Sequence, residues 1–245
     1  MSRDTVLITG VGSGVGLSLA RHLAQRFHVI GIARRGPAAR EALAKAGLVN
    51  VYEADLSDPA ALSECLDEIL KVHGTPGRLV NNAGVNLPDR IESLDTHRIA
   101  TSFQVNCLAP WTIMQRLLPG MVAMGFGRIV NVTSGAPLNC FPGFAAYTAS
   151  KAALNALTVT AAREYEDHDI RINLMSPGPV RSNMAPNAPM DPAVCHPTAD
   201  YLLDLPSGGP TGRFFWLGRE IPLFPDLEGI EWLEGRAPER FGRVL

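Results

Sequence analysis

The chain alternates short apolar runs with longer stretches in which apolar residues recur every three or four positions. The short runs are typical of buried strands, and the periodic stretches of amphipathic helices. The apolar runs predict strands at residues 5–8, 28–33, 48–52, 78–81, 128–133, 171–175 and 212–217. The periodic stretches predict helices at 17–27, 38–46, 59–72, 147–166 and 201–205, and one long or two successive helices at 93–124, with Pro110 near the join.

Strand and helix alternate along the whole chain, and this order predicts one parallel sheet with helices on both faces. We therefore expect an α/β protein across residues 1–245, a single-domain Rossmann fold with a doubly wound parallel sheet of about seven strands. Residues 1–182 form the expected cofactor-binding and catalytic core, and the weakly periodic, proline-rich segment 183–211 an expected substrate lid. Residues 212–217 are the expected last strand, and 218–245 form a tail.

The composition excludes several classes of function. The 245 residues are 46% hydrophobic, and a net charge of −2 offers no basic surface for nucleic acid or an anionic membrane. No window approaches the ~18–20 apolar residues of a membrane span, and the first apolar run is too short for a signal peptide. The four cysteines are widely spaced, show no metal-binding pattern, and suit small core residues of a cytoplasmic protein (Cys65, Cys107, Cys140 and Cys195).

The richest chemistry lies between residues 134 and 151. Tyr147 and Lys151 are one helical turn apart, so the phenol and the ammonium share a helix face, roughly 5–6 Å apart at Cβ. A free phenol has a pKa near ~10, and a cation about 5 Å away favours the phenolate by roughly two pKa units. Ser134 ends the predicted strand 128–133, so we expect Tyr147 to exchange a proton with a carbonyl oxygen that Ser134 polarises. A surface lysine after a core tyrosine would give the same spacing, so the surrounding motifs decide.

A glycine-rich turn joins the first strand to the first helix. It contains Gly10, Gly14 and Gly16, and such a turn lets backbone N–H groups approach a pyrophosphate at a helix N-terminus. The second strand ends at Arg34 and Arg35, where NAD-binding proteins of this fold carry an acidic residue. Because two guanidinium groups could hold a 2′-phosphate, we expect NADP(H) to be preferred, with NAD(H) possible.

Two further strand ends carry candidate cofactor residues. Asp55 follows the third strand, where its carboxylate could accept from an adenine amino group or cap the next helix, although Asp58 is the better cap. The segment 81–84 reads Asn-Asn-Ala-Gly, and its small residues allow a cofactor to approach closely.

In order and spacing, these motifs resemble the short-chain dehydrogenase/reductase family over residues 5–182, and more loosely as far as 217. The resemblance implies a catalytic tetrad of Asn106, Ser134, Tyr147 and Lys151, in which Lys151 also binds the nicotinamide ribose and the Asn106 backbone holds a water. It further implies that the cofactor contacts come from Gly10, Ser13, Gly14, Val15, Gly16, Arg34, Arg35, Asp55, Leu56, Asn82, Ala83, Gly84, Tyr147, Lys151, Pro177, Gly178, Val180 and Ser182.

The same resemblance implies an enzyme that transfers a hydride between NADP(H) and a small or medium apolar ketone or aldehyde, or the corresponding alcohol. The apolar candidates for the substrate pocket would equally fit ordinary core packing. The pocket residues we expect are Asn86, Leu138, Asn139, Phe141, Phe144 and Met184.

Two other functions compete with this hypothesis. A 3-oxoacyl thioester reductase would need a basic patch for an acyl carrier, and residues 121–127 carry no charge. A non-catalytic dinucleotide sensor or scaffold is disfavoured because all four tetrad positions are filled. The last strand, 212–217, resembles the carbonyl-reductase side of the family, and we expect a homodimer or homotetramer paired through the long helices.

Overall fold

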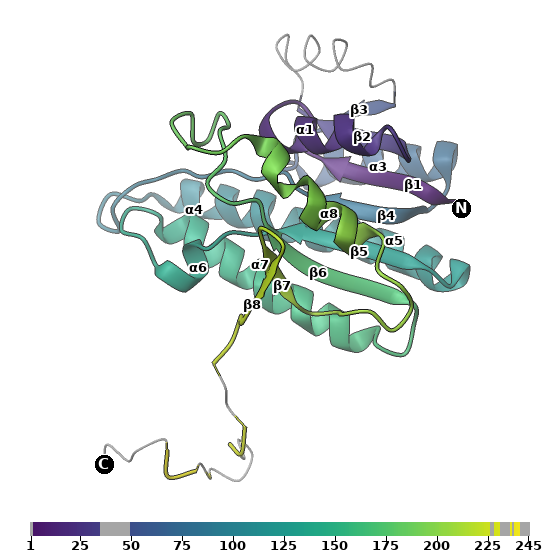
Figure 1. Ribbon diagram of the computed structural model, residues 1–245. Helices are drawn as coiled ribbons and strands as arrows, with labels where there is room; N and C mark the ends of the chain where they lie inside the picture. Colours follow the sequence, from purple (N-terminus) through teal and green to yellow (C-terminus); the bar gives the residue numbers. More distant parts are fainter. Residues whose placement is uncertain (1, 35–49, 226–227, 231–235, 237, 241–245) are drawn as a thin grey trace.

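The computed structural model describes residues 2–34, 50–225, 228–230, 236 and 238–240, and its centre is an eight-stranded sheet (Figure 1). The strands lie in the order β3-β2-β1-β4-β5-β6-β7-β8, and every neighbouring pair is parallel except β7 with β8. This order confirms the predicted α/β Rossmann architecture. The strands are β1 Ser2–Thr9, β2 His28–Ala33, β3 Val51–Glu53, β4 Pro76–Asn81, β5 Gly127–Val132, β6 Ile170–Ser176, β7 Phe214–Trp216 and β8 Arg219–Ile221.

The eighth strand corrects the expectation of a tail that begins at residue 218. Strands β7 and β8 form a hairpin whose two loop residues, Leu217 and Gly218, both have positive φ, 47° and 76°. Two such residues match the twist of a two-residue hairpin turn. A leucine rarely adopts this conformation, so the turn had no clear signal in the sequence.

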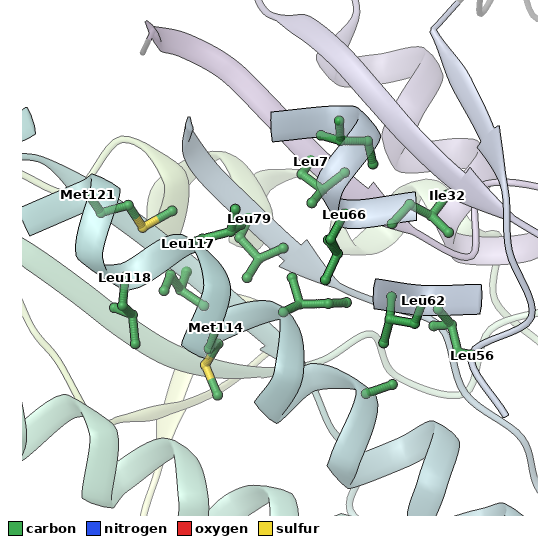
Figure 2. Close-up of a cluster of buried hydrophobic side chains, with 14 of the residues drawn as sticks. Leu7, Ile32, Leu56, Leu62, Leu66, Leu79, Met114, Leu117, Leu118 and Met121 are labelled. Carbon is green, nitrogen blue, oxygen red and sulfur yellow. The ribbon is translucent and has the colours of Figure 1, made fainter. Parts of the chain in front are cut away.

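Helices cover both faces of the sheet, because neighbouring strand residues point to opposite sides. On β1, Leu7 joins the core cluster that packs under α3, α5 and α7, whereas Ile8 joins the cluster under α1 and α8. Figure 2 shows the first cluster, to which α3 contributes Leu62 and Leu66 and α5 contributes Leu117. The helices are α1 Gly14–Leu23, α3 Pro59–His73, α4 Thr96–Phe103, α5 Ala109–Met124, α6 Ala136–Asn139, α7 Ala145–Glu164 and α8 His196–Leu203.

The stretch predicted as one or two helices, 93–124, is two helices joined by a π-helical turn at Gln104–Leu108. Asp95 caps the start of α4 by accepting from the Arg98 N–H at 2.8 Å. Pro110 lies at the first turn of α5, where its missing N–H leaves no α-helical donor for the carbonyl of Asn106. The wide turn therefore lies where the helical stretch lacks one of its usual N–H donors.

Helix α8 is part of the core, although it falls within the expected lid segment 183–211. Its residues Leu202 and Leu203 are fully buried under the sheet. Arg78 donates to the carbonyl of Leu203 at 2.9 Å, and Arg128 to the carbonyl of Leu205 at 2.7 Å. Only a short part of the expected lid segment 183–211 therefore precedes α8, and this part ends at the 3₁₀ turn Pro192–Cys195.

The remaining expectations concern element boundaries, the cysteines and membrane spans. Helix α7 begins two residues before the predicted start, and α8 five residues before the short helix expected at 201–205. The expected helix 38–46 and residues 48–49 of the third strand lie outside the described residues. Three cysteines are buried as expected, but Cys140 is exposed, in a left-handed conformation at the end of α6. Among the helices described, none has the length and apolar character to span a membrane.

Candidate active site

The side chains with candidate chemistry gather beyond the C-terminal ends of β4 and β5, where open α/β sheets bind their ligands. Ser134 follows β5 by two residues, and α7 returns across this end of the sheet with Tyr147 and Lys151 on its first turns. The hydroxyl of Ser134 lies close enough to the phenol of Tyr147 to lower its pKa. The structure thus brings a hydroxyl and a phenol together, as the sequence predicted.

The electrostatic part of that expectation is wrong for this structure. Burial raises the pKa of Tyr147 above its ordinary value, and the neighbouring hydroxyl of Ser134 lowers it only in part. The ammonium of Lys151, which the sequence expected to lower this pKa, donates to the carbonyl of Val132. Desolvation of the phenolate is therefore the larger effect, and it opposes ionisation.

Lys151 is 3% exposed and directs its ammonium at the backbone. Its Nζ donates to the carbonyl of Val132, the last residue of β5, at 2.7 Å. Burial lowers the pKa of Lys151 from 10.5 to about 8, and the nearby Cys107 opposes this shift. A side chain at Gly84 would come within 3.6 Å of this Nζ, so the glycine leaves room beside the ammonium.

Asn106 lies in the π-helical turn, and its side chain joins that turn to the segment after β4 and to α7. Its Oδ1 accepts from the N–H of Val85 at 2.8 Å, and its Nδ2 donates to the carbonyl of the same residue at 2.9 Å. The Nδ2 also donates to the hydroxyl of Ser150 on α7 at 2.9 Å. The side chain is fully buried and satisfied, so any contact of Asn106 with water or ligand falls to its backbone.

The glycine-rich turn is packed too tightly for larger residues. A Cβ on Gly16 would lie 2.2 Å from the carbonyl oxygen of Gly10 and 2.4 Å from Nδ2 of Asn82. The same Nδ2 donates to the carbonyl of Thr9 at 2.9 Å, while the Thr9 hydroxyl accepts from the N–H groups of Asn82 and Ala83, both at 3.0 Å. These bonds tie the end of β4 to the end of β1, beneath the turn.

The first turn of α1 fits a bound pyrophosphate. Ser13 is its N-terminal capping residue, but no side chain accepts from the first N–H groups. Free N–H groups at a helix N-terminus favour an anion. Val15, also predicted to contact the cofactor, packs its side chain partly against the core beneath α1.

The residues predicted to contact the adenosine differ in whether the structure describes them and in what their side chains contact. Arg34 is exposed at the end of β2, whereas Arg35 lies outside the described residues. Asp55 accepts from the N–H and the hydroxyl of Ser57, at 2.9 and 2.7 Å. Burial acts to raise the pKa of Asp55, but these bonds and the charge of Arg34 leave it below its ordinary value. Leu56 points its side chain into the core, so only its backbone faces the site.

The loop after β6 returns to the glycine turn. A Cβ on Gly14 would meet the Cβ of Ser182 at 3.2 Å, and the Ser182 hydroxyl accepts from the N–H of Ala185 at 3.2 Å. Gly178 has a φ of 86° and lies against the side chain of Leu217, while Val180 is buried and pairs with Met190. Pro177 precedes them, partly exposed. The loop predicted to cradle the nicotinamide therefore lies beside the turn predicted to hold the pyrophosphate.

The candidate substrate residues are mostly exposed. Leu138 and Phe141 are 45% and 49% exposed, and Phe141 meets Phe144 edge to face, with ring centroids 6.5 Å apart. Met184 is 45% exposed on the loop after β6. The two amides differ: Asn139 donates to the carbonyl of Gly135 at 2.7 Å, but the buried Oδ1 of Asn86 has no hydrogen-bond partner among the described residues.

Sequence reasoning missed a set of buried polar residues behind the site. Thr133 donates its hydroxyl to Oδ1 of Asn155 at 2.6 Å, and Asn131 donates to the hydroxyl of Thr158 at 2.8 Å. Asn81 of β4 donates in turn to Oδ1 of Asn131 at 2.8 Å. The available signal was the presence of Asn131 within an otherwise apolar strand, since a polar residue in a buried strand needs a partner.

Comparisons with known proteins agree with this arrangement. Residues 4–192 match the family model for short chain dehydrogenases. The uncharacterized oxidoreductase YbbO of Escherichia coli strain K12 is 33% identical over 187 residues, 76% of this chain and 69% of that protein. The solved structure of a short chain dehydrogenase/reductase family protein superposes with a TM-score of 0.79 at 29% identity, covering 86% of this chain and 94% of that one.

A second solved structure, an NADPH-bound carbonyl reductase from chicken fatty liver, has a TM-score of 0.77 and 25% identity, covering 89% of this chain and 98% of its own. The chain belongs to the short-chain dehydrogenase family of oxidoreductases. The family resemblance read from the motifs is thereby confirmed.

Proposed function

We propose that the protein is an NADP(H)-dependent oxidoreductase that interconverts a small or medium apolar ketone or aldehyde and its alcohol. The observation that carries the proposal is the placement of Ser134 beside Tyr147, with Lys151 one turn along the same helix. This trio lies at the sheet edge where the uncapped N-terminus of α1 and the glycine turn are suited to a dinucleotide.

In this proposal the nicotinamide supplies the hydride chemistry, and the chain supplies position and protons. Ser134 donates to the carbonyl oxygen of the substrate, and Tyr147 gives that oxygen a proton in reduction and removes it in oxidation. Lys151 holds the nicotinamide ribose. The backbone carbonyl of Asn106 holds a water that returns the proton from solvent.

The NADP preference rests on the end of β2. Arg34 is exposed there, and the neighbouring described positions offer no carboxylate to bind a ribose 2′-hydroxyl. A guanidinium suits a 2′-phosphate, since it makes paired, charge-assisted hydrogen bonds. Asp55, with its lowered pKa, stays ionised at neutral pH and would accept from the adenine amino group.

The apolar substrate class rests on exposed apolar side chains of α6, of the turn after it and of the loop after β6. Leu138, Phe141 and Met184 are each close to half exposed, and an apolar ligand would cover such surface. Asn86 and Asn139 would supply polar contacts, and Phe144 a wall behind Phe141.

We further propose that the protein works as a homodimer or homotetramer in the cytoplasm. Leu108 and Trp111 are about half exposed at the start of α5, which supports pairing through the long helices.

A carbonyl panel tests the function. Purified protein is mixed with NADPH, or with NADH, and with ketones and aldehydes of increasing apolar size, while the absorbance of the reduced nicotinamide is followed. We expect turnover with NADPH on apolar carbonyls, and none with the Tyr147→Phe control. NADPH binding without turnover across the panel would instead identify a dinucleotide sensor.

A further inference from the structure

Helix α7 is attached to the end of β5 by a continuous series of hydrogen bonds. Three successive residues of the strand and its extension each bond to one position of the helix, and those positions are spaced by four and three residues. Such spacing places all three on one helix face, which Tyr147 shares because it lies four residues before Lys151. We call this set the β5–α7 ladder; its hydrogen bonds are Thr133–Asn155, Val132–Lys151 and Asn131–Thr158.

The hydrogen bond between Thr133 and Asn155 joins the end of β5, which leads into Ser134, to α7, which carries Tyr147. Thr133 is 2% exposed and Asn155 4% exposed, and the hydroxyl donates to Oδ1 at 2.6 Å. The N–H of Thr133 donates to the carbonyl of Met175 on β6 at 2.8 Å, so the backbone here is fixed to the sheet. Thr133 directly precedes Ser134, and Asn155 lies two turns after Tyr147 on the same face of α7.

The hydrogen bond between Thr133 and Asn155 fixes both the rotation of α7 about its axis and its position along that axis. A slip of one residue along a helix is ~1.5 Å of rise and ~100° of rotation, and it would turn Tyr147 away from Ser134. A buried acceptor that loses its donor costs ~1–3 kcal/mol, so Asn155 resists such a slip. Catalysis is sensitive to displacements of this size, since ~1 Å of misplacement can cost ~10²-fold in rate.

We propose that Thr133 and Asn155 are positioning residues, which set the placement of Tyr147 relative to Ser134 by locking α7 to the end of β5. This inference rests on the proposed oxidoreductase function for its catalytic consequence, but the geometry it asserts is independent of any substrate. Neither residue touches the reacting atoms; both act through the catalytic pair.

The test compares two substitutions at one position. Thr133→Val keeps the shape of the side chain and removes the hydroxyl, whereas Thr133→Ser keeps the hydroxyl. We expect Thr133→Val to lower kcat on the order of 10²-fold, with KM for NADPH within about twofold of wild type. The basic limb of its kcat profile should move to higher pH, because a displaced Ser134 lowers the pKa of Tyr147 less. Thr133→Ser should restore both.

Thr198→Val is the matched control. Thr198 is also a buried threonine, and its hydroxyl accepts from the N–H of Gly218 at 2.9 Å, away from the ladder. This variant should lose comparable stability in urea unfolding yet keep the wild-type kcat profile. If Thr133→Val behaves like Thr198→Val, the role of Thr133 is only structural and the proposal is overturned.

Crystal structures provide a readout that needs no turnover. In Thr133→Val the oxygens of Ser134 and Tyr147 should lie about 1 Å or more farther apart than in wild type, and in Thr133→Ser their separation should match wild type. Asn155→Leu, which removes the acceptor, should give the same separation if Thr133→Val does not fold. An unchanged pair in the variants refutes the positioning role, whereas an inactive wild type with the predicted separations refutes only the proposed function.

Discussion

Replacing Lys151 with methionine is expected to stabilise the folded protein while it removes activity. The ammonium is fully buried, and its one hydrogen bond given by the structure runs to the carbonyl of Val132. Methionine has a similar length and no charge, so it fills the same space without the desolvation of a cation.

The magnitude follows from the pKa of Lys151. A fall from 10.5 to about 8 on folding corresponds to a cost of about 3 kcal/mol for keeping the charged form at pH 7. Loss of the hydrogen bond to Val132 offsets about 1.5 kcal/mol of this gain. We therefore expect Lys151→Met to raise the free energy of unfolding at pH 7 by about 1.5 kcal/mol.

The pH dependence gives a second measure. Because the folded pKa is depressed, the cost is fully present below about pH 8 and is relieved as the pH rises toward 10.5. In urea titrations without cofactor, the advantage of Lys151→Met should therefore shrink between about pH 7 and about pH 10. Lys71→Met is the control, since Lys71 is exposed on α3 and its replacement should change stability by no more than about 0.5 kcal/mol.

A Lys151→Met protein that is less stable than wild type at pH 7 would refute this reasoning. So would an advantage that stays constant with pH, because it would come from packing rather than from the buried charge. NADPH should also stabilise the variant less than wild type, since the variant lacks the group proposed to hold the ribose.

Three further predictions concern the cofactor, the proton transfer and the histidine at the start of α8. Arg34→Asp should weaken NADPH binding by about tenfold more than NADH binding in fluorescence titrations, and equal effects would defeat the NADP assignment. Tyr147→Phe should bind NADPH within about twofold of wild type yet lose about 10³-fold in kcat; weak binding would give the phenol another role. Burial and the neighbouring His22 hold the pKa of His196 below its ordinary value, so stability should fall as the pH drops from about 6.5 toward the folded pKa. His196→Gln should reduce that fall in thermal unfolding, and an unchanged slope would contradict it.

The features that the sequence predicted well are those with a periodic or local cause. The apolar run 128–133 predicted β5 because a buried parallel strand is apolar on both faces. The helical spacing of Tyr147 and Lys151 placed both on one turn of α7, and Ser134 followed from the end of the strand. Pro110 correctly indicated a break between α4 and α5.

The features that it missed depend on contacts between distant segments. The π-helical turn at 104–108 arises where Asn106 clamps Val85 and Ser150, and no local pattern reports such a clamp. The direction of the Lys151 ammonium was also wrong, since it depends on a carbonyl 19 residues away. Spacing fixed which face Lys151 occupies, but the choice between Tyr147 and a backbone acceptor needs the folded site.

The loop between β6 and α8 is held at both ends. The N–H of Arg181 donates to the carbonyl of Met190 at 2.8 Å, and the N–H of Met190 to the carbonyl of Pro179 at 3.1 Å. Beyond it, Arg78 and Arg128 fix the far end of α8. Substitutions between these two anchors, at residues 183–189, should therefore alter what the loop contacts while the sheet and α8 stay folded.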